Sequence, residues 1–181
     1  MLRRSIDFAS DIGAAIVNLH LYMDRGPEAY VWSMLPTLRY AAEKNVRISI
    51  ENTPHTSPAD FNRTFDCFWS FNDVDRRRVG MCFDIGHANV CAATQNDFVR
   101  YIDELSPTVP IIHMHVHENW GDADTHLTLF TGPAGRDNSG VRALLERLRR
   151  REYEGAMILE QWPYPPEMLI QTRNRLFSML A

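Results

Sequence analysis

The segment IIHMHVHENWGDADTH, residues 111–126, contains four of the seven histidines of the chain. Its first half alternates histidine with apolar residues, in the order His113, Met114, His115, Val116 and His117. In a β-strand this alternation places the three imidazoles on one face and the apolar side chains on the other. Two interpretations stay open from this segment alone. Either the strand and the following Asp124 and His126 form a cluster of metal ligands, or the histidines pack in the core and a polar turn follows.

The rest of the chain alternates predicted strands with predicted helices. Apolar runs typical of buried strands lie on both sides of the histidine segment, at 14–21, 46–52, 79–87 and 156–162. Helical spacing predicts helices at 3–12, 27–44, 95–105, 141–151 and 166–180, and another that begins near Ser57 or Asp60. Strands that alternate with helices form a parallel sheet covered by helices. No linker interrupts residues 1–181, so we expect a single α/β domain.

Composition and charge exclude several classes of protein. The 181 residues are 45% hydrophobic and 23% charged, which is typical of a folded globular domain. The net charge of −4 gives no overall attraction to nucleic acid, and we interpret one basic run as a solvated helix end: Arg147, Arg149, Arg150 and Arg151. Three cysteines without CxxC spacing favour a reducing compartment over a disulfide framework. The sequence has no apolar run long enough to span a bilayer, so we expect a cytoplasmic protein.

Each predicted strand ends in a side chain that can bind a cation. In strand order these side chains are His20, Glu51, Asp84 with the nearby His87, His115, and Glu160. A strand buried by helices has little reason to end in a carboxylate unless a cation lies there, because burying an unpaired charge costs free energy. In a closed parallel barrel the carboxyl ends of the strands converge on one mouth. Two glutamates, one aspartate and one histidine suit Mn, Mg, Co or Zn, among which the sequence does not choose.

Five short motifs make the chain resemble the xylose isomerase-like (β/α)8 barrel superfamily. They are IEN at 50–52, FDIGH at 83–87, HVHEN at 115–119, DTH at 124–126 and ILE at 158–160. This superfamily includes sugar isomerases and epimerases and the endonuclease IV type of abasic-site nucleases, AP endonuclease family 2. The combination and order of the motifs carry the resemblance, which extends from His20 to Glu160. It implies a TIM-barrel fold.

The resemblance also implies roles for the residues at the strand ends. The four ligands of one divalent metal would be Glu51, Asp84, His115 and Glu160. The catalytic acid–base pair would be Glu51 and Glu160. Groups that contact the substrate in the sugar enzymes, or bind further metal in the nucleases, would be His20, His87, Asp124 and His126. Two other histidines share the parity of His115, and we interpret them as packing or supporting groups: His113 and His117.

The sequence departs from the family pattern in two respects. The Gly-x-Gly segment that usually follows the loop histidine is replaced by LTLFTGPAG at 127–135, so the substrate and the loop geometry are expected to differ. Five strands are predicted where a barrel has eight, and the three missing βα units are expected to precede Met1. An open parallel sheet exposes two edges and an apolar inner face. We therefore expect self-association, as a homo-oligomer or an aggregate, rather than a well-behaved monomer.

Three functional hypotheses follow. The first is a divalent-metal-dependent isomerase or epimerase of sugars or sugar acids, in which a proton moves next to a carbonyl through an enediolate and Glu51 and Glu160 exchange it. The second is an abasic-site DNA nuclease with a multinuclear zinc site. The acidic balance of the sequence disfavours it, because neutralisation of phosphates dominates affinity for duplex DNA. The third is an inactive barrel fragment or interaction module.

Overall fold

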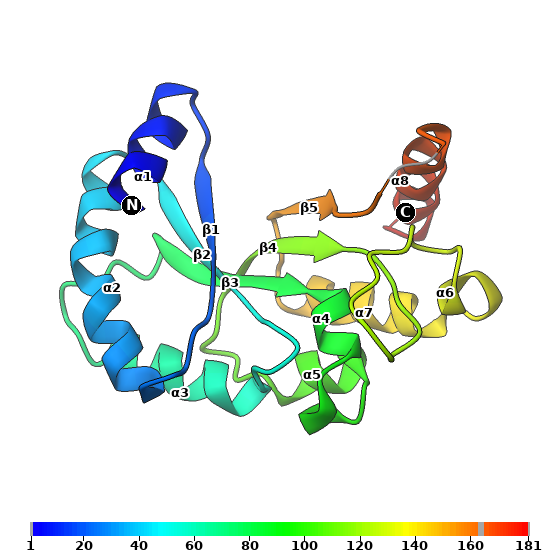
Figure 1. The fold of residues 1–181 in the computed structure, drawn as a ribbon, viewed down its shortest axis with the longest axis horizontal. Coiled ribbons are helices and arrows are strands. Elements are labelled where there is room, and N and C mark those ends of the chain that lie inside the picture. Colours follow the sequence, from blue (N-terminus) through cyan, green and yellow to red (C-terminus); the bar gives the residue numbers. More distant parts are fainter. Residues whose placement is uncertain (1, 163–164, 181) are drawn as a thin grey trace.

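Five parallel strands form one curved sheet in a computed structural model that describes residues 2–162 and 165–180 (Figure 1). In sheet order, which is also chain order, they are β1 (Ile16–His20), β2 (Arg47–Glu51), β3 (Val79–Asp84), β4 (Ile111–Val116) and β5 (Ala156–Leu159). The register places His20 beside Glu51, and Asp84 beside His115. The predicted parallel α/β sheet is confirmed, and it forms part of a TIM-barrel wall.

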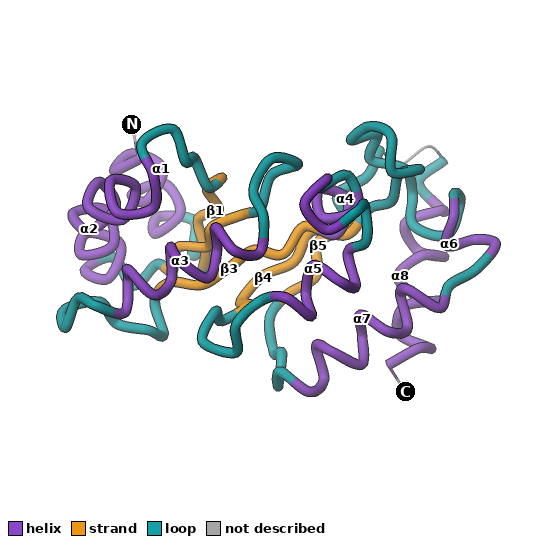
Figure 2. Tube along the Cα trace, turned by 90° about the horizontal axis from the view of Figure 1, so that it is seen from below, coloured by secondary structure: helices purple, strands orange, loops and turns teal. Residues whose placement is uncertain are grey.

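Helices connect the strands and cover the outer face of the sheet. The longer helices are α1 (Leu2–Asp11), α2 (Gly26–Glu43), α3 (Pro58–Trp69), α7 (Ser139–Arg150) and α8 (Glu167–Leu180). The shorter ones are α4 (Ile85–Asn89), η1 (Ala92–Thr94), α5 (Phe98–Glu104) and α6 (Pro133–Arg136). Figure 1 shows the helices α3, α5 and α7 below the strands, on the side from which Figure 2 is viewed. The inner face of the sheet carries no helix in the described part of the chain (Figure 1).

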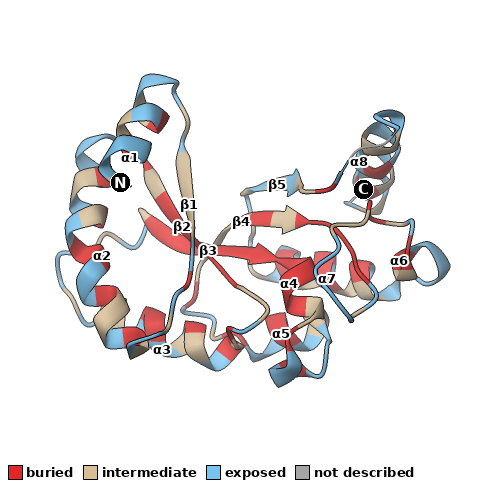
Figure 3. Ribbon diagram, in the orientation of Figure 1, coloured by how far each residue is buried: buried red, intermediate tan, exposed pale blue. Residues whose placement is uncertain are grey.

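The hydrophobic core lies between the outer face of the sheet and these helices. Ile48 and Ile50 of β2 are fully buried, as are three aromatic residues of α3: Phe61, Phe65 and Phe68. Buried positions run along β2, β3 and β4 in Figure 3. Helix α3 begins at Ser57, whose side chain accepts the N–H of Asp60, while the Asp60 carboxylate accepts the N–H of Ser57. This capping box settles which of the two predicted N-caps is used.

The predicted strand 79–87 is too long, because it ends at Asp84 and residues 85–89 form helix α4. Asp84 caps this helix, since its carboxylate accepts the backbone N–H of His87 at 2.7 Å. His87 therefore projects from a helix and not from a strand. The strand predicted at 156–162 likewise ends at Leu159.

The basic run at the end of α7 is only partly solvated. Arg147 pairs with Asp103 of α5 at 2.9 Å. Arg151 is half-buried and donates to the backbone carbonyl groups of Ser106 and Val109, both at 3.3 Å. The expectation of a solvated helix end is wrong for Arg151. Its guanidinium group turns inward because backbone carbonyl groups in the loop before β4 need hydrogen-bond donors. None of the described helices combines the length and apolar character that crossing a membrane requires.

Candidate metal centre

Side chains from four neighbouring strands meet at the carboxyl edge of the sheet. Glu51 ends β2, Asp84 ends β3, His115 lies one residue before the end of β4, and Glu160 directly follows β5. One ligand atom from each lies within 4.8 Å of the other three. Asp84 is fully buried and Glu51 is 3% exposed. The four residues expected to bind one metal are thus brought together, because alternate residues of parallel strands face the same side.

Two buried atoms of this cluster face each other at the distance of an ion pair, but their geometry does not make a hydrogen bond. Nδ1 of His115 lies 2.7 Å from Oε2 of Glu160. Neither atom has a hydrogen-bond partner among the described residues. Nδ1 is also 3.3 Å from Oε1 of Glu51 and 3.7 Å from Oδ2 of Asp84. Because buried polar atoms cost free energy when unpaired, this convergence of three carboxylates and one imidazole fits a divalent cation.

The environment shifts the pKa values of the two glutamates in opposite directions. Burial would raise the pKa of Glu51, but the adjacent imidazoles of His115 and His87 hold it well below its usual range. Burial raises the pKa of Glu160, and although His115 lowers it, the charges of Asp84 and Glu51 raise it further. Three carboxyl groups this close repel one another when all are ionised. A bound divalent cation would offset that repulsion.

Two asparagine side chains that the sequence interpretation did not single out, the buried Asn52 and the half-buried Asn18, position the acidic residues. The amide of Asn52 donates to the carbonyl oxygen of Asp84 at 2.9 Å and accepts the N–H of Asp84 at 2.8 Å. The amide of Asn18 donates to Oε2 of Glu51 and accepts the hydroxyl of Ser49 at 2.7 Å. The signal available in the sequence was an amide side chain beside, or two residues before, a strand-end ligand.

His117 supports the cluster through its contact with Asp84. Its ring is fully buried, and its Nε2 lies 3.1 Å from Oδ1 of Asp84. Gly86 leaves the space that the ring occupies, since a Cβ atom at that position would lie 1.9 Å from Cε1 of His117. The glycine of the DIGH motif is therefore explained by close packing against an imidazole. This contact agrees with the expectation that His117 is a packing or supporting group.

A second group of possible ligands lies next to the first. Nε2 of His87 is 3.0 Å from Oδ2 of Asp124, which is 3.3 Å from Nε2 of His126. Burial alone would lower the pKa of His87, but the carboxylates of Glu51, Asp84 and Asp124 raise it to about 9. Nδ1 of His126 donates to the carbonyl oxygen of Glu160 at 2.8 Å, which ties this group to the first.

His20 lies at the exposed rim of the site. Its side chain is 45% exposed, and its Nε2 is 3.6 Å from Oε1 of Glu51. One of its ring nitrogens lies within 4.8 Å of ligand atoms of Glu51 and His87. His20 can therefore reach either a bound substrate or a further cation above the buried cluster.

Glu118 holds the loop that replaces the usual Gly-x-Gly segment. Its carboxylate accepts the backbone N–H of Gly132 and, at 2.9 Å, that of Ala134 at the start of α6. Its own backbone pairs with Leu127 in an isolated antiparallel bridge. Glu118 is buried, so the acidic residue of the HVHEN motif anchors the loop and does not face the cluster. The sequence interpretation assigned it no role.

A family comparison agrees with this arrangement of motifs, elements and side chains. Residues 1–177 match the model of the xylose isomerase-like TIM barrel family. The chain belongs to this family. The resemblance inferred from the five motifs is therefore confirmed, and with it the incomplete TIM-barrel fold.

Individual relatives of this barrel family are more distant. The chain is 27% identical to the uncharacterized protein MJ1311 of Methanocaldococcus jannaschii over 168 residues, 88% of this chain and 55% of that protein. It superposes on a D-tagatose 3-epimerase-like protein with a TM-score of 0.71 at 22% identity, covering 98% of this chain and 66% of the other. For the TTHB071 protein of Thermus thermophilus, soaked with ZnCl2, the TM-score is 0.68 at 22% identity, covering 96% and 66%. The chain thus spans about half the length of the curated relative.

Proposed function

We propose that this chain carries the metal centre of a divalent-metal-dependent isomerase or epimerase that acts on sugars or sugar acids. The observation that carries the proposal is the approach of Glu51 and Glu160. Two strands, β3 and β4, separate the strands that position them, yet their carboxylate oxygens lie within 4.8 Å of each other and of ligand atoms of Asp84 and His115. The sugar class is supported by the family and by the D-tagatose 3-epimerase-like structure.

The proposed chemistry is a proton transfer next to a carbonyl group. A divalent ion held by the four residues would act as a Lewis acid that polarises the carbonyl and stabilises the enediolate. Glu51 would accept the proton from the carbon beside the carbonyl, and Glu160 would return a proton from the other side. The hydrogen bond from Asn18 fixes the orientation of the Glu51 carboxylate. His87 bonds to the backbone carbonyl of Asn52 through Nδ1 at 2.8 Å, and its Nε2 would contact a substrate hydroxyl by exchanging its present bond to Asp124.

The proposal is tested by metal content and solvent isotope exchange measured on the same preparations. Protein purified without chelators is analysed by elemental mass spectrometry and then incubated in D2O with a panel of ketoses, aldoses and sugar acids. We expect one divalent ion per chain that depends on the carboxylate cluster, and deuterium incorporation beside the carbonyl. Asp84→Ala should lose both, and Glu160→Gln should lose isotope exchange while keeping its fold. The exposed Glu104→Gln variant is the matched control. Full exchange in Glu160→Gln would refute the acid–base assignment.

A second candidate function has one observation in its favour. His87, Asp124 and His126 offer a second group of ligand atoms within 4.8 Å of one another, as a multinuclear zinc nuclease requires. The discriminating experiment incubates zinc-loaded protein with a duplex that contains one abasic site. Clean nicking at that site with two or three zinc ions per chain would favour the nuclease. An absence of both metal and activity would favour the inactive barrel fragment.

A further inference from the structure

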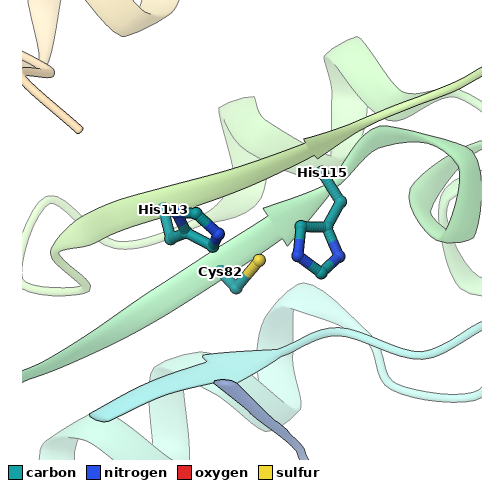
Figure 4. A group of neighbouring side chains, drawn as sticks. All are labelled: Cys82, His113 and His115. Atoms are coloured by element: carbon teal, nitrogen blue, oxygen red, sulfur yellow. The ribbon is translucent and has the colours of Figure 1, made fainter. Parts of the chain in front are cut away.

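Below the acidic cluster, the inner face of the sheet carries a second set of cation ligands with different chemistry. Cys82 of β3 is paired in register with His113 of β4, and His115 follows two residues later on the same face. The Sγ atom of Cys82 and one ring nitrogen from each histidine lie within 4.8 Å of one another. Figure 4 shows all three side chains turned toward a common point between the strands.

We propose that Cys82, His113 and His115 bind a thiophilic divalent ion, such as zinc or cobalt, at a second site that shares His115 with the carboxylate cluster. One thiolate and two imidazoles prefer borderline and soft metals, whereas the three carboxylates above prefer hard ones. Three protein ligands leave the fourth tetrahedral position of such an ion open to water.

This trio includes a polar atom without a hydrogen-bond partner among the described residues. Nδ1 of His113 is buried and has no hydrogen-bond partner among the described residues. The Cys82 side chain beside it is fully buried. An ordinary core histidine usually satisfies its ring nitrogens, because an unpaired buried polar atom costs free energy. A bound ion would take up one nitrogen of the His113 ring and leave Nδ1 or Nε2 free to carry its proton, and it would stabilise the Cys82 sulfur as a thiolate.

An ion can reach the trio from the open side of the sheet. In register with His113 and His115 lie Ala156 and Ile158 of β5, on the same inner face. Both are exposed, Ile158 to 47%. The half-buried ring of His113 lies between this exposed strand and the buried thiol of Cys82. The two half-buried histidines thus border the open inner face of the sheet, and the buried Cys82 sulfur lies beside them.

His115 connects the two sites through opposite sides of one ring. Its Nδ1 atom faces the carboxylates of Glu51 and Glu160. The other ring nitrogen, Nε2, points toward Cys82 in Figure 4. Binding at the lower site would release the thiol proton of Cys82 to water, and when both sites are filled the His115 ring also releases its N–H proton. Occupancy of one site must therefore change the affinity of the other.

Cobalt titration of the full chain, reduced and free of chelators, tests the site without any assay of activity. A thiolate ligand gives cobalt a charge-transfer absorption in the near ultraviolet that carboxylate and imidazole ligands do not give. We expect this absorption in the unmodified chain and its loss in Cys82→Ser. Two matched controls should keep it, Cys67→Ser for an unrelated thiol and Glu160→Gln for the carboxylate cluster. His113→Gln should weaken cobalt binding by about tenfold or more.

Each outcome decides the question. Absence of the absorption in the unmodified chain, or its persistence in Cys82→Ser, would overturn the proposal. Equal loss in Cys67→Ser would overturn it as well, because the sulfur ligand would then be elsewhere. If Cys82→Ser loses its circular dichroism and fails to fold, the half-buried His113→Gln decides, and unchanged cobalt affinity in that variant refutes the site. A lack of isomerase activity would not change the cobalt absorption or the cobalt affinity, so the two proposals can fail independently.

Discussion

Asn52 holds the backbone of Asp84 with two hydrogen bonds, one donated and one accepted, between residues 32 positions apart. Both residues are fully buried, so water cannot replace either bond. Asn52→Ala should therefore cost about 1–3 kcal/mol for each backbone group left unpaired. Urea unfolding followed by circular dichroism measures this free energy of unfolding, and elemental analysis should find a lower metal content.

Asn62 offers a matched control for that variant. Its amide donates to the carbonyl oxygen of Glu104 at 3.0 Å and accepts the N–H of Ser106 at 2.8 Å, but it is only half-buried. Water can replace these bonds, so Asn62→Ala should cost less and leave metal content unchanged. Equal losses of stability in the two variants would contradict the role assigned to Asn52.

Gly86→Ala should disrupt the support beneath Asp84. The new Cβ would lie 1.9 Å from Cε1 of His117, and both His117 and residues 85–88 of α4 are buried. Overpacking of this kind costs about 1–3 kcal/mol or more. Thermal unfolding should show the loss, and a crystal structure should show His117 moved away from Asp84. Gly13→Ala, where a Cβ meets nothing within 4 Å, measures the separate cost of a left-handed backbone.

Glu118→Ala should free the loop that contains α6. The carboxylate accepts two backbone N–H groups, and hydrogen bonds to a buried charge are worth about 1.5–3 kcal/mol each. Hydrogen–deuterium exchange of the Gly132 and Ala134 amides should become faster, while exchange in β2 and β3 stays slow. The exposed Glu146→Ala variant removes a surface ion pair with Arg150 and should cost about 0–1 kcal/mol. Unchanged protection of the loop in Glu118→Ala would exclude the anchoring role.

Self-association should depend on the open inner face. Ile158 on that face is 47% exposed, and the neighbouring Trp162 is 82% exposed, so burial between two chains would remove apolar surface from water. Multi-angle light scattering should give a mass above that of one chain that rises with concentration. Ile158→Asp should lower it. A monodisperse monomeric mass for the unmodified protein would show this prediction to be wrong.

The sequence predicted which candidate ligands lie close together better than it predicted which residues hold them in place. Alternation of side chains along β2 and β4 was enough to place Glu51 and His115 on one face, because the period of a strand is two. It could not show that Asp84 ends its strand by capping a helix, since a buried apolar run looks the same in a strand and in a short buried helix.

The sequence did not predict the contacts that support these ligands, for a related reason. The bonds of Asn52 to Asp84 and of Glu118 to Gly132 join segments that only the folded chain brings together. Arg151 was misjudged in the same way, because its carbonyl partners at Ser106 and Val109 lie more than forty residues earlier in the chain. Short-range patterns carry no information on such pairs, although the motif that contains Asn52 marked the position.

Strand β5 is the shortest strand of the described sheet, with four residues, and it lies at an edge with alternate residues exposed. It also positions Glu160, the final member of the acidic cluster along the chain. Edge strands with little buried surface detach more readily than the core. The affinity of the cluster for an ion is thus set by how often β5 is docked, as well as by the ligands themselves. An ion bound to the cluster would in turn hold β5 against the sheet and slow its detachment. The affinity for the ion would then measure how stably β5 is docked.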